Sequence, residues 1–183
     1  MSIHLATILK TERKLKTNFE LKANCRTQQS IHEYIGGAED AVKYLRAHKV
    51  NILRDSLVKI DNSFYIAGRE DLSSNHSSRG KRKDISQIMA GADRTLPVIL
   101  LDHQPFHLDE AEGNGIDFQI SGHTHHGQLW PFGYLTNLIY EVSWGYKKKG
   151  NTQIYVSSGF GGWGPPVRTG NNPEILCFDL TFK

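Results

Sequence analysis

A four-residue apolar run, Val98–Leu101, leads directly into Asp102 and His103 and is the feature that most constrains the fold of this chain. A strand that is apolar at every position must be covered on both faces, which is typical of the middle of an α/β sheet. A helical stretch at 108–112 and a strand-like run at 117–120 follow it. This order predicts a β-α-β unit whose parallel strands are joined by a right-handed crossover.

The rest of the chain also alternates between helical and strand patterns. Apolar side chains that recur at helical spacing predict a helix over 38–48. The runs 57–60 and 64–67 flank a turn signal, Asp61-Asn62-Ser63, and therefore predict a hairpin. Further elements are expected at 51–53, 84–89, 154–156 and 175–182.

The 183 residues amount to one domain, with room for a short appendage. We expect residues 31–183 to form that domain and residues 1–30 to be a divergent amino-terminal segment. Within the segment, Leu9, Lys10 and their neighbours suit an amphipathic, partly basic helix packed on another element.

Composition excludes several classes of protein. Lys and Arg total 22 and Asp and Glu total 19, a formal net charge of +3, so no nucleic-acid partner is expected. The longest apolar runs have four residues, whereas a helix needs roughly 20 to span a bilayer. We therefore expect no transmembrane segment and a soluble chain of undetermined localisation. Cys25 and Cys177 are far apart and are expected to be free thiols.

Histidine is concentrated in one part of the sequence. The chain has nine histidines, and His103 and His123 each follow a predicted strand. The carboxyl ends of parallel strands share one edge of the sheet, where ligands bind, and His125 lies two residues further along. These three are either loop histidines without a role or ligands of a zinc, iron, manganese or nickel ion, and their convergence favours a metal site. His107 and His126 are expected to be supporting or surface residues.

Four sequence blocks together resemble the last metal-binding blocks of the calcineurin-like metallophosphoesterases. They are Leu100-Leu101-Asp102-His103-Gln104-Pro105, Ser121-Gly122-His123-Thr124-His125, Gly127-Gln128-Leu129-Trp130-Pro131 and Trp163-Gly164-Pro165-Pro166-Val167-Arg168. The resemblance covers roughly residues 31–183 and is closest to a bacterial branch whose full-length members often carry membrane segments. It implies two sheets packed face to face and flanked by helices, and hydrolysis of phosphate mono- or diesters at a two-metal centre of Mn, Fe, Zn or Ni ions.

The resemblance also implies roles for individual residues. His103 and His123 would hold one metal ion and His125 the other. His32 matches the histidine of the family's Gly-Asn-His-Glu block, which assists the leaving group as an acid. Independently of the resemblance, the glycine-rich loop 159–164 could form a backbone cradle near a phosphate with Arg168 as its bidentate partner, although a structural role for this loop is the stronger alternative.

The sequence departs from the family pattern in its first part. Ile31 stands where the family has a metal-binding Asn, and no Gly-Asp pair supplies the bridging carboxylate. The chain thus looks like a member that lacks the first metal-binding blocks, with an incomplete two-sheet sandwich. It is either an active phosphoesterase or an inactive, truncated remnant that binds at most one metal ion, and the missing ligands favour the second. A partner chain, or residues such as Asp71 and His4, could complete the site.

One further polar segment, Arg69-Glu70-Asp71, follows a predicted strand. It could face the same edge of the sheet as the histidines, or it could form a surface salt-bridge cluster, which we favour.

Overall fold

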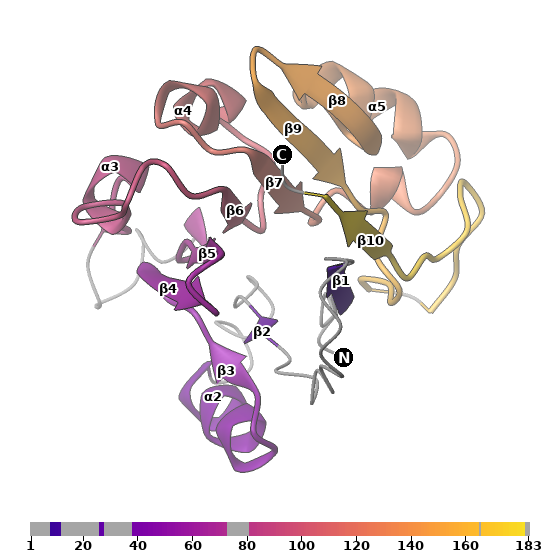
Figure 1. Ribbon diagram of the computed structural model, residues 1–183. Helices are drawn as coiled ribbons and strands as arrows, with labels where there is room; N and C mark the ends of the chain where they lie inside the picture. The colour runs from indigo at the N-terminus through magenta and orange to yellow at the C-terminus, as the bar shows by residue number, and fades with distance from the viewer. Residues whose placement is uncertain (1–7, 12–25, 28–37, 73–80, 165, 182–183) are drawn as a thin grey trace.

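The computed structural model of the chain describes residues 8–11, 26–27, 38–72, 81–164 and 166–181 (Figure 1). The main element in these ranges is a six-stranded mixed sheet with helices beside it, which confirms the predicted α/β class. In spatial order the strands are β4 (Ser56–Ile60), β5 (Phe64–Gly68), β6 (Val98–Leu101), β7 (Phe118–Ser121), β9 (Thr152–Val156) and β8 (Gly145–Lys149).

The pairing of these strands confirms two predictions. Strands β4 and β5 form the expected antiparallel hairpin. Strands β6 and β7 are parallel, with Leu101 opposite Ile120, and α4 (Leu108–Gly113) connects them. Because β5, β6, β7 and β9 all run in the same direction, their carboxyl ends lie at one edge of the sheet.

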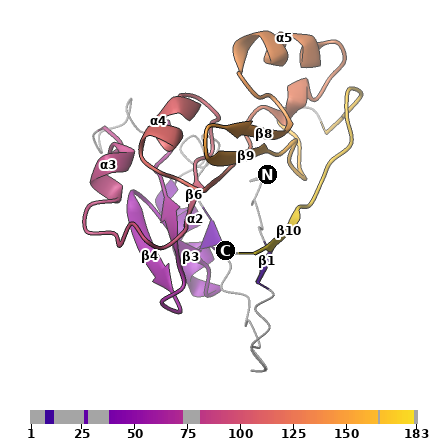
Figure 2. The same ribbon diagram turned by 45° about the horizontal axis from the view of Figure 1, so that its top comes forward.

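Alternating side chains of the central strand β6 belong to two separate cores. On one face, Val98 and Leu100 pack against α3 (Ile85–Ile88) and α4, which lie side by side in Figures 1 and 2. On the opposite face, Ile99 and Leu101 pack with Phe118 and Ile120. All of these side chains are buried, so β6 is covered on both faces as its sequence predicts.

A smaller layer covers part of the second face. Strand β10 (Cys177–Leu180) pairs in parallel with β1 (Ile8–Thr11). The ring of Phe178 lies edge-on to Phe118, with 5.0 Å between centroids, and to Tyr155, at 5.5 Å. The described ranges therefore contain the large sheet, this two-stranded partner packed against it, and a second two-stranded sheet formed by residues 26–27 and 51–52. Cys177 is free and exposed.

The remaining described elements lie at the periphery of the large sheet. They are α2 (Ala38–Ala47), β2 (Arg26–Thr27), β3 (Asn51–Ile52), α5 (Phe132–Ile139) and the 3-10 turn η2 (His125–Gly127). The predicted helix at 38–48 is confirmed. No helix in the part of the chain that the structure covers is long and apolar enough to cross a membrane.

The structure corrects one prediction in the amino-terminal segment and adds two elements. Residues 8–11 form strand β1, not part of an amphipathic helix, because pairing with β10 outweighs the local helical pattern. Helix α5 and strand β8 were not predicted from the sequence. The division of the chain at residue 30 remains a prediction.

Candidate functional site

His103 and His123 lie together at the carboxyl edge of the large sheet. Each follows the end of its strand, and two backbone hydrogen bonds join the segments. Asp102 N donates to Ile120 O (3.2 Å) and Gly122 N donates to His103 O (3.0 Å). The two imidazole rings are 5.1 Å apart between centroids and nearly perpendicular, at 77°. The convergence expected from two parallel strand ends is therefore present.

This ring separation suits a shared metal ion. Two imidazoles bound to one zinc ion through bonds of about 2.0–2.1 Å in tetrahedral geometry have ring centres roughly 5 Å apart. Both histidines are half-buried, so the position between them is partly shielded from water. The separation of the two rings is thus compatible with two imidazoles on one ion.

The turn after β7 has an unusual backbone. His123, His125 and His126 have φ values of 70°, 49° and 46°, in the left-handed region, and each such non-glycine residue costs of order 1–3 kcal/mol. Gly127 follows with φ 76°, and a Cβ there would overlap the backbone of Gly133 in α5. Thr124 stabilises the turn, because its hydroxyl accepts from His126 N (3.1 Å) and donates to Ser143 O.

His125 is hydrogen-bonded to Arg168. The Nη2 of Arg168 lies 3.1 Å from His125 Nδ1, and because a guanidinium only donates, Nδ1 must accept. Arg168 also donates to Ser158 O (2.7 Å) and Asn171 Oδ1 (2.6 Å), and its partial burial lowers its pKa. Asn171 Nδ2 in turn donates to His125 O (2.7 Å). Arg168 therefore links His125 to the glycine-rich loop.

His126 belongs to a hydrogen-bonded chain. Its Nδ1 lies 2.8 Å from the hydroxyl of Ser143, which lies 2.6 Å from Asn137 Oδ1. The Asn137 oxygen can only accept, so the Ser143 proton points to it and His126 Nδ1–H donates to Ser143. The His126 ring also packs on Trp144, with 5.2 Å between centroids. His126 is thus a half-buried supporting residue, whereas His107 is exposed at the start of α4.

Tyr140, to which the sequence reading gave no role, also lies at the site. Its ring is edge-on to His123, with 6.3 Å between centroids, and packs on Phe106 at 4.7 Å. Burial raises the pKa of the Tyr140 hydroxyl, so this group stays protonated at neutral pH and can donate a hydrogen bond. Its position depends on the end of α5, so its spacing in the sequence could not reveal it.

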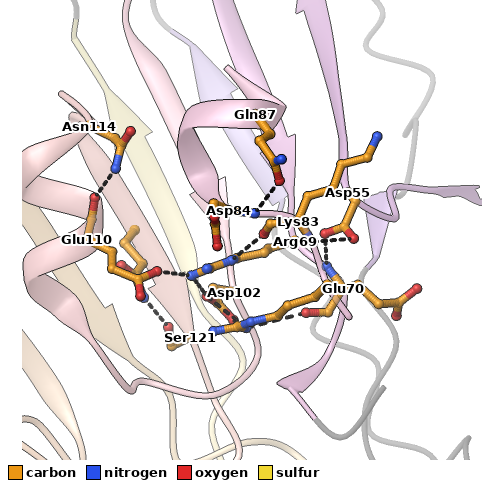
Figure 3. Close-up of polar contacts among 12 residues, drawn as sticks. Asp55, Arg69, Glu70, Lys83, Asp84, Gln87, Asp102, Glu110, Asn114 and Ser121 are labelled. Carbon is orange, nitrogen blue, oxygen red and sulfur yellow. Dashed lines mark hydrogen bonds and ion pairs between the residues drawn. The ribbon is translucent and has the colours of Figure 1, made fainter. Parts of the chain in front are cut away.

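A buried ionic network surrounds Asp102, the residue before His103 (Figure 3). The carboxylate of Asp102 accepts from Arg82 Nη1 (3.1 Å) and Arg69 Nη1 (3.4 Å), and Arg69 also pairs with Glu110 Oε2 (2.7 Å). Burial raises the pKa of Asp102, and the two arginines act in the opposite direction. Since Asp102 precedes His103, this network holds the strand end from which the histidine projects.

The segment Arg69-Glu70-Asp71 is buried, so the expectation of a surface cluster is wrong. These side chains come directly after β5 and contact residues that come directly after β6. Asp71 Oδ1 accepts from Gln104 Nε2 (3.0 Å), and Gln104 is the residue after His103. The segment therefore supports the sheet edge that carries the histidines.

These residues fit part of a metal centre. In the described ranges, no group of three or more His, Cys, Asp or Glu side chains is arranged to hold a metal ion. His32 and His4 lie outside these ranges. Two cations about 4 Å apart repel strongly unless anionic ligands offset their charge, and the described residues alone do not supply a ligand set for such a centre.

Known proteins similar to this chain are metallophosphoesterases. A protein named an uncharacterized metallophosphoesterase from Helicobacter pylori (strain J99) is 36% identical over 161 residues, covering 83% of this chain and 41% of that protein. One of the same name from Aquifex aeolicus is 34% identical over 160 residues, covering 83% and 59%. A Danio rerio protein named a transmembrane protein with metallophosphoesterase domain is 30% identical over 152 residues, covering 78% and 35%.

The chain belongs to the metallophosphoesterase family, which generally uses divalent metal ions. It spans 41% of the length of the Helicobacter relative and 59% of that of the Aquifex relative. No family model matches the sequence, and no solved structure matches it.

Proposed function

We propose that this chain is a divalent-metal-dependent phosphoesterase that acts on phosphate mono- or diesters, with His103 and His123 binding one ion. The observation that carries this proposal is the 5.1 Å separation of the two rings at the carboxyl edge of the sheet. A divalent ion at such a site polarises a phosphoryl oxygen and lowers the pKa of bound water.

We assign the remaining roles to other residues near the histidine pair and to His32, which belongs to the block that resembles the family's Gly-Asn-His-Glu. His125 is the ligand of a second ion, which requires Arg168 Nη2 to leave His125 Nδ1. His32, which lies outside the described residues, is the acid for the leaving group. Arg168 contributes positive charge for the substrate phosphate once its Nη2 has left His125 Nδ1. Tyr140, whose ring lies edge-on to His123, is a further donor to a bound phosphate through its hydroxyl.

A second candidate is a non-catalytic protein that binds one metal ion at most. Two observations favour it: Ile31 occupies the position of a family metal ligand, and His125 Nδ1 accepts a hydrogen bond from Arg168. Under this proposal the histidine pair still binds an ion, but hydrolysis requires ligands from a partner chain or does not occur.

Metal stoichiometry and hydrolysis together separate the two candidates. The purified chain is equilibrated with Mn²⁺ or Zn²⁺, and bound metal is measured by elemental analysis. Turnover of p-nitrophenyl phosphate and bis-p-nitrophenyl phosphate is measured on the same samples. Two ions per chain with turnover support the enzyme, and one ion without turnover supports the non-catalytic candidate.

The variant His123→Ala tests the assignment of the ligand, with His107→Ala as its matched control because His107 is an exposed histidine of the same region. We expect His123→Ala to lose bound metal and any turnover, and His107→Ala to keep both. Equal metal content in the two variants would show that His123 is not a metal ligand.

A further inference from the structure

The side chain of Gln128, which directly follows η2, is bonded to the loop that carries Arg168. Gln128 is fully buried. Its Oε1 accepts from Trp163 N (2.8 Å), and its Nε2 donates to Trp163 O (2.9 Å) and Val167 O (3.0 Å). These bonds use the acceptor oxygen and both N–H donors of the amide. A carboxylate of the same shape cannot replace it, because it would face two carbonyl oxygens.

The backbone of Gln128 holds the same loop on the other side of Arg168. Gln128 O accepts from Thr169 N (3.0 Å) and Gly170 N (3.2 Å). The residues before and after Arg168 are therefore bonded to one residue. The guanidinium of Arg168 reaches His125, which lies in the turn that Gln128 ends. The turn thus fixes the backbone around Arg168 independently of its head group.

Two backbone features accompany this contact. Gln128 has φ 48° and ψ −49°, a conformation that is unfavourable for a residue with a side chain. Such residues persist where the surrounding contacts determine them, and they cluster at functional sites. On the opposite side, a Cβ at Gly162 would lie 3.1 Å from Gln128 Oε1 and 3.2 Å from Nε2. Glycine at position 162 therefore lets the loop lie directly on the amide.

A second contact closes the base of the loop. Glu174 Oε1 accepts from Ser158 N (2.8 Å), and Glu174 N donates to Gly159 O (3.1 Å). These bonds join the two ends of the loop to each other. Gln128, in contrast, is bonded to the residues that flank Arg168, so the position of Arg168 depends most directly on Gln128.

We propose that Gln128 is a positioning residue for phosphate binding by Arg168. Arg168 Nη2 has to leave His125 before it can contact a phosphate, and with both flanking segments held on Gln128 only the side chain turns. A guanidinium binds phosphate best as a planar fork with two parallel hydrogen bonds, and less entropy is lost on binding when the backbone is already ordered. The inference rests on the proposed function through the role of Arg168.

Phosphate affinity tests the proposal in the intact chain. The chain is equilibrated with Mn²⁺, and binding of inorganic phosphate is measured by isothermal titration calorimetry. Gln128→Glu should bind about tenfold more weakly, which corresponds to one hydrogen bond to a charged group. The matched control is Gln119→Glu, at a buried glutamine of β7 whose Nε2 donates to Ser121 Oγ, and it should bind as the wild type does. Wild-type affinity in Gln128→Glu would overturn the proposal.

A double-mutant cycle separates positioning from a general structural defect. Arg168→Ala should also bind phosphate about tenfold more weakly. The double variant should bind no more weakly than Arg168→Ala, because Gln128 acts through Arg168 and the two effects are not additive. Additive losses would overturn the proposal.

Hydrogen exchange of the Arg168 Nε–H gives a second measurement that needs neither phosphate nor hydrolysis. This group donates to Gly161 O (3.2 Å), and ¹H–¹⁵N NMR follows its exchange with solvent. We expect exchange about tenfold faster in Gln128→Glu, because the loop opens more often. Faster exchange together with unchanged phosphate affinity in Arg168→Ala would contradict the proposed function of Arg168. Exchange at the wild-type rate would overturn the positioning by Gln128.

A milder variant keeps the test valid if the buried carboxylate prevents folding. Gly162→Ala places a Cβ against the Gln128 amide and should weaken phosphate binding about threefold, because the loop must shift. Gly113→Ala, where a Cβ would meet no atom within 4 Å, is its control and should keep the wild-type affinity. Equal affinities of these two variants would overturn the proposal. Thermal melting checks that every variant is folded.

Discussion

Arg168 donates a hydrogen bond to Nδ1 of His125 over 3.1 Å, although the two residues lie 43 positions apart in the sequence. This bond makes a candidate metal ligand part of the structural link between η2 and the glycine-rich loop. The same guanidinium donates to Ser158 O and Asn171 Oδ1. Removing it should therefore affect both the stability of the loop and the availability of His125.

The variant Arg168→Ala should lower the free energy of unfolding by about 1.5–3 kcal/mol, the range for hydrogen bonds to charged groups. Urea unfolding measures the change. Arg168→Lys should recover little of the loss, because an ammonium cannot reproduce the planar fork that reaches several acceptors. Full recovery with lysine would show that charge alone matters at this position.

The hydrogen-bonded chain of His126, Ser143 and Asn137 defines the tautomer of His126. We expect ¹⁵N NMR of the neutral ring to show the proton on Nδ1. Ser143→Ala should cost about 1–3 kcal/mol, because it leaves that N–H without its acceptor. Asn137→Ala is the control at an exposed position of α5 and should cost less. A proton on Nε2 would contradict the assigned direction of the hydrogen bonds from His126 to Ser143 and from Ser143 to Asn137.

Asp102 is buried between Arg69 and Arg82. Asp102→Ala should destabilise the fold by about 3–5 kcal/mol, because it leaves two buried guanidinium groups without their shared carboxylate. The change is measured by chemical unfolding. Glu110→Gln, which removes the more exposed carboxylate on Arg69, should cost much less. Similar losses for the two variants would show that Arg69 does not depend on Asp102.

The ion pairs of Glu141 predict a pH dependence. Hydrogen bonds from Lys149 and Lys147 lower the pKa of Glu141 below its ordinary value near 4.5. The stabilisation is therefore fully present above that ordinary value and is lost as the pH falls through the lowered pKa. Because the side chain is partly exposed, the effect is a few tenths of a kcal/mol. The difference in melting temperature between the wild type and Glu141→Gln should be small at neutral pH and vanish in acid.

Metal binding should stabilise the fold through the histidine pair. A ligand bound to the folded state alone contributes about 2.7 kcal/mol at one hundred times its dissociation constant. Zn²⁺ should therefore raise the melting temperature of the wild type, and a chelator should reverse the rise. His103→Ala should not respond, whereas His107→Ala should respond as the wild type does. An equal response of both variants would place the metal elsewhere.

The position of the histidine pair could be predicted from local sequence alone. An apolar run such as Val98–Leu101 can be buried only as a covered strand, and the parallel pairing of β6 and β7 brings their ends together. The order of strand, helix and strand implies that pairing. The convergence of His103 and His123 followed from these two facts.

Other features could not be predicted because distant segments create them. Strand β1 exists through its pairing with β10, and the buried Asp71 is hydrogen-bonded to Gln104, which lies 33 positions away in the sequence. Helix α5 was not predicted either, and its exposure could not be, because all its residues remain accessible despite their apolar character. In each case the local pattern agreed with more than one structure.

The sequence by itself determined the α/β class, the covered central strands and the edge at which His103 and His123 meet, because apolar periodicity and chain order depend only on neighbouring residues. Only the tertiary structure decided which partners these residues have. Arg168 reaches His125, and Arg69 and Arg82 reach Asp102, through contacts between segments far apart in the chain. Such contacts arise from three-dimensional packing and leave no periodic signal in the sequence.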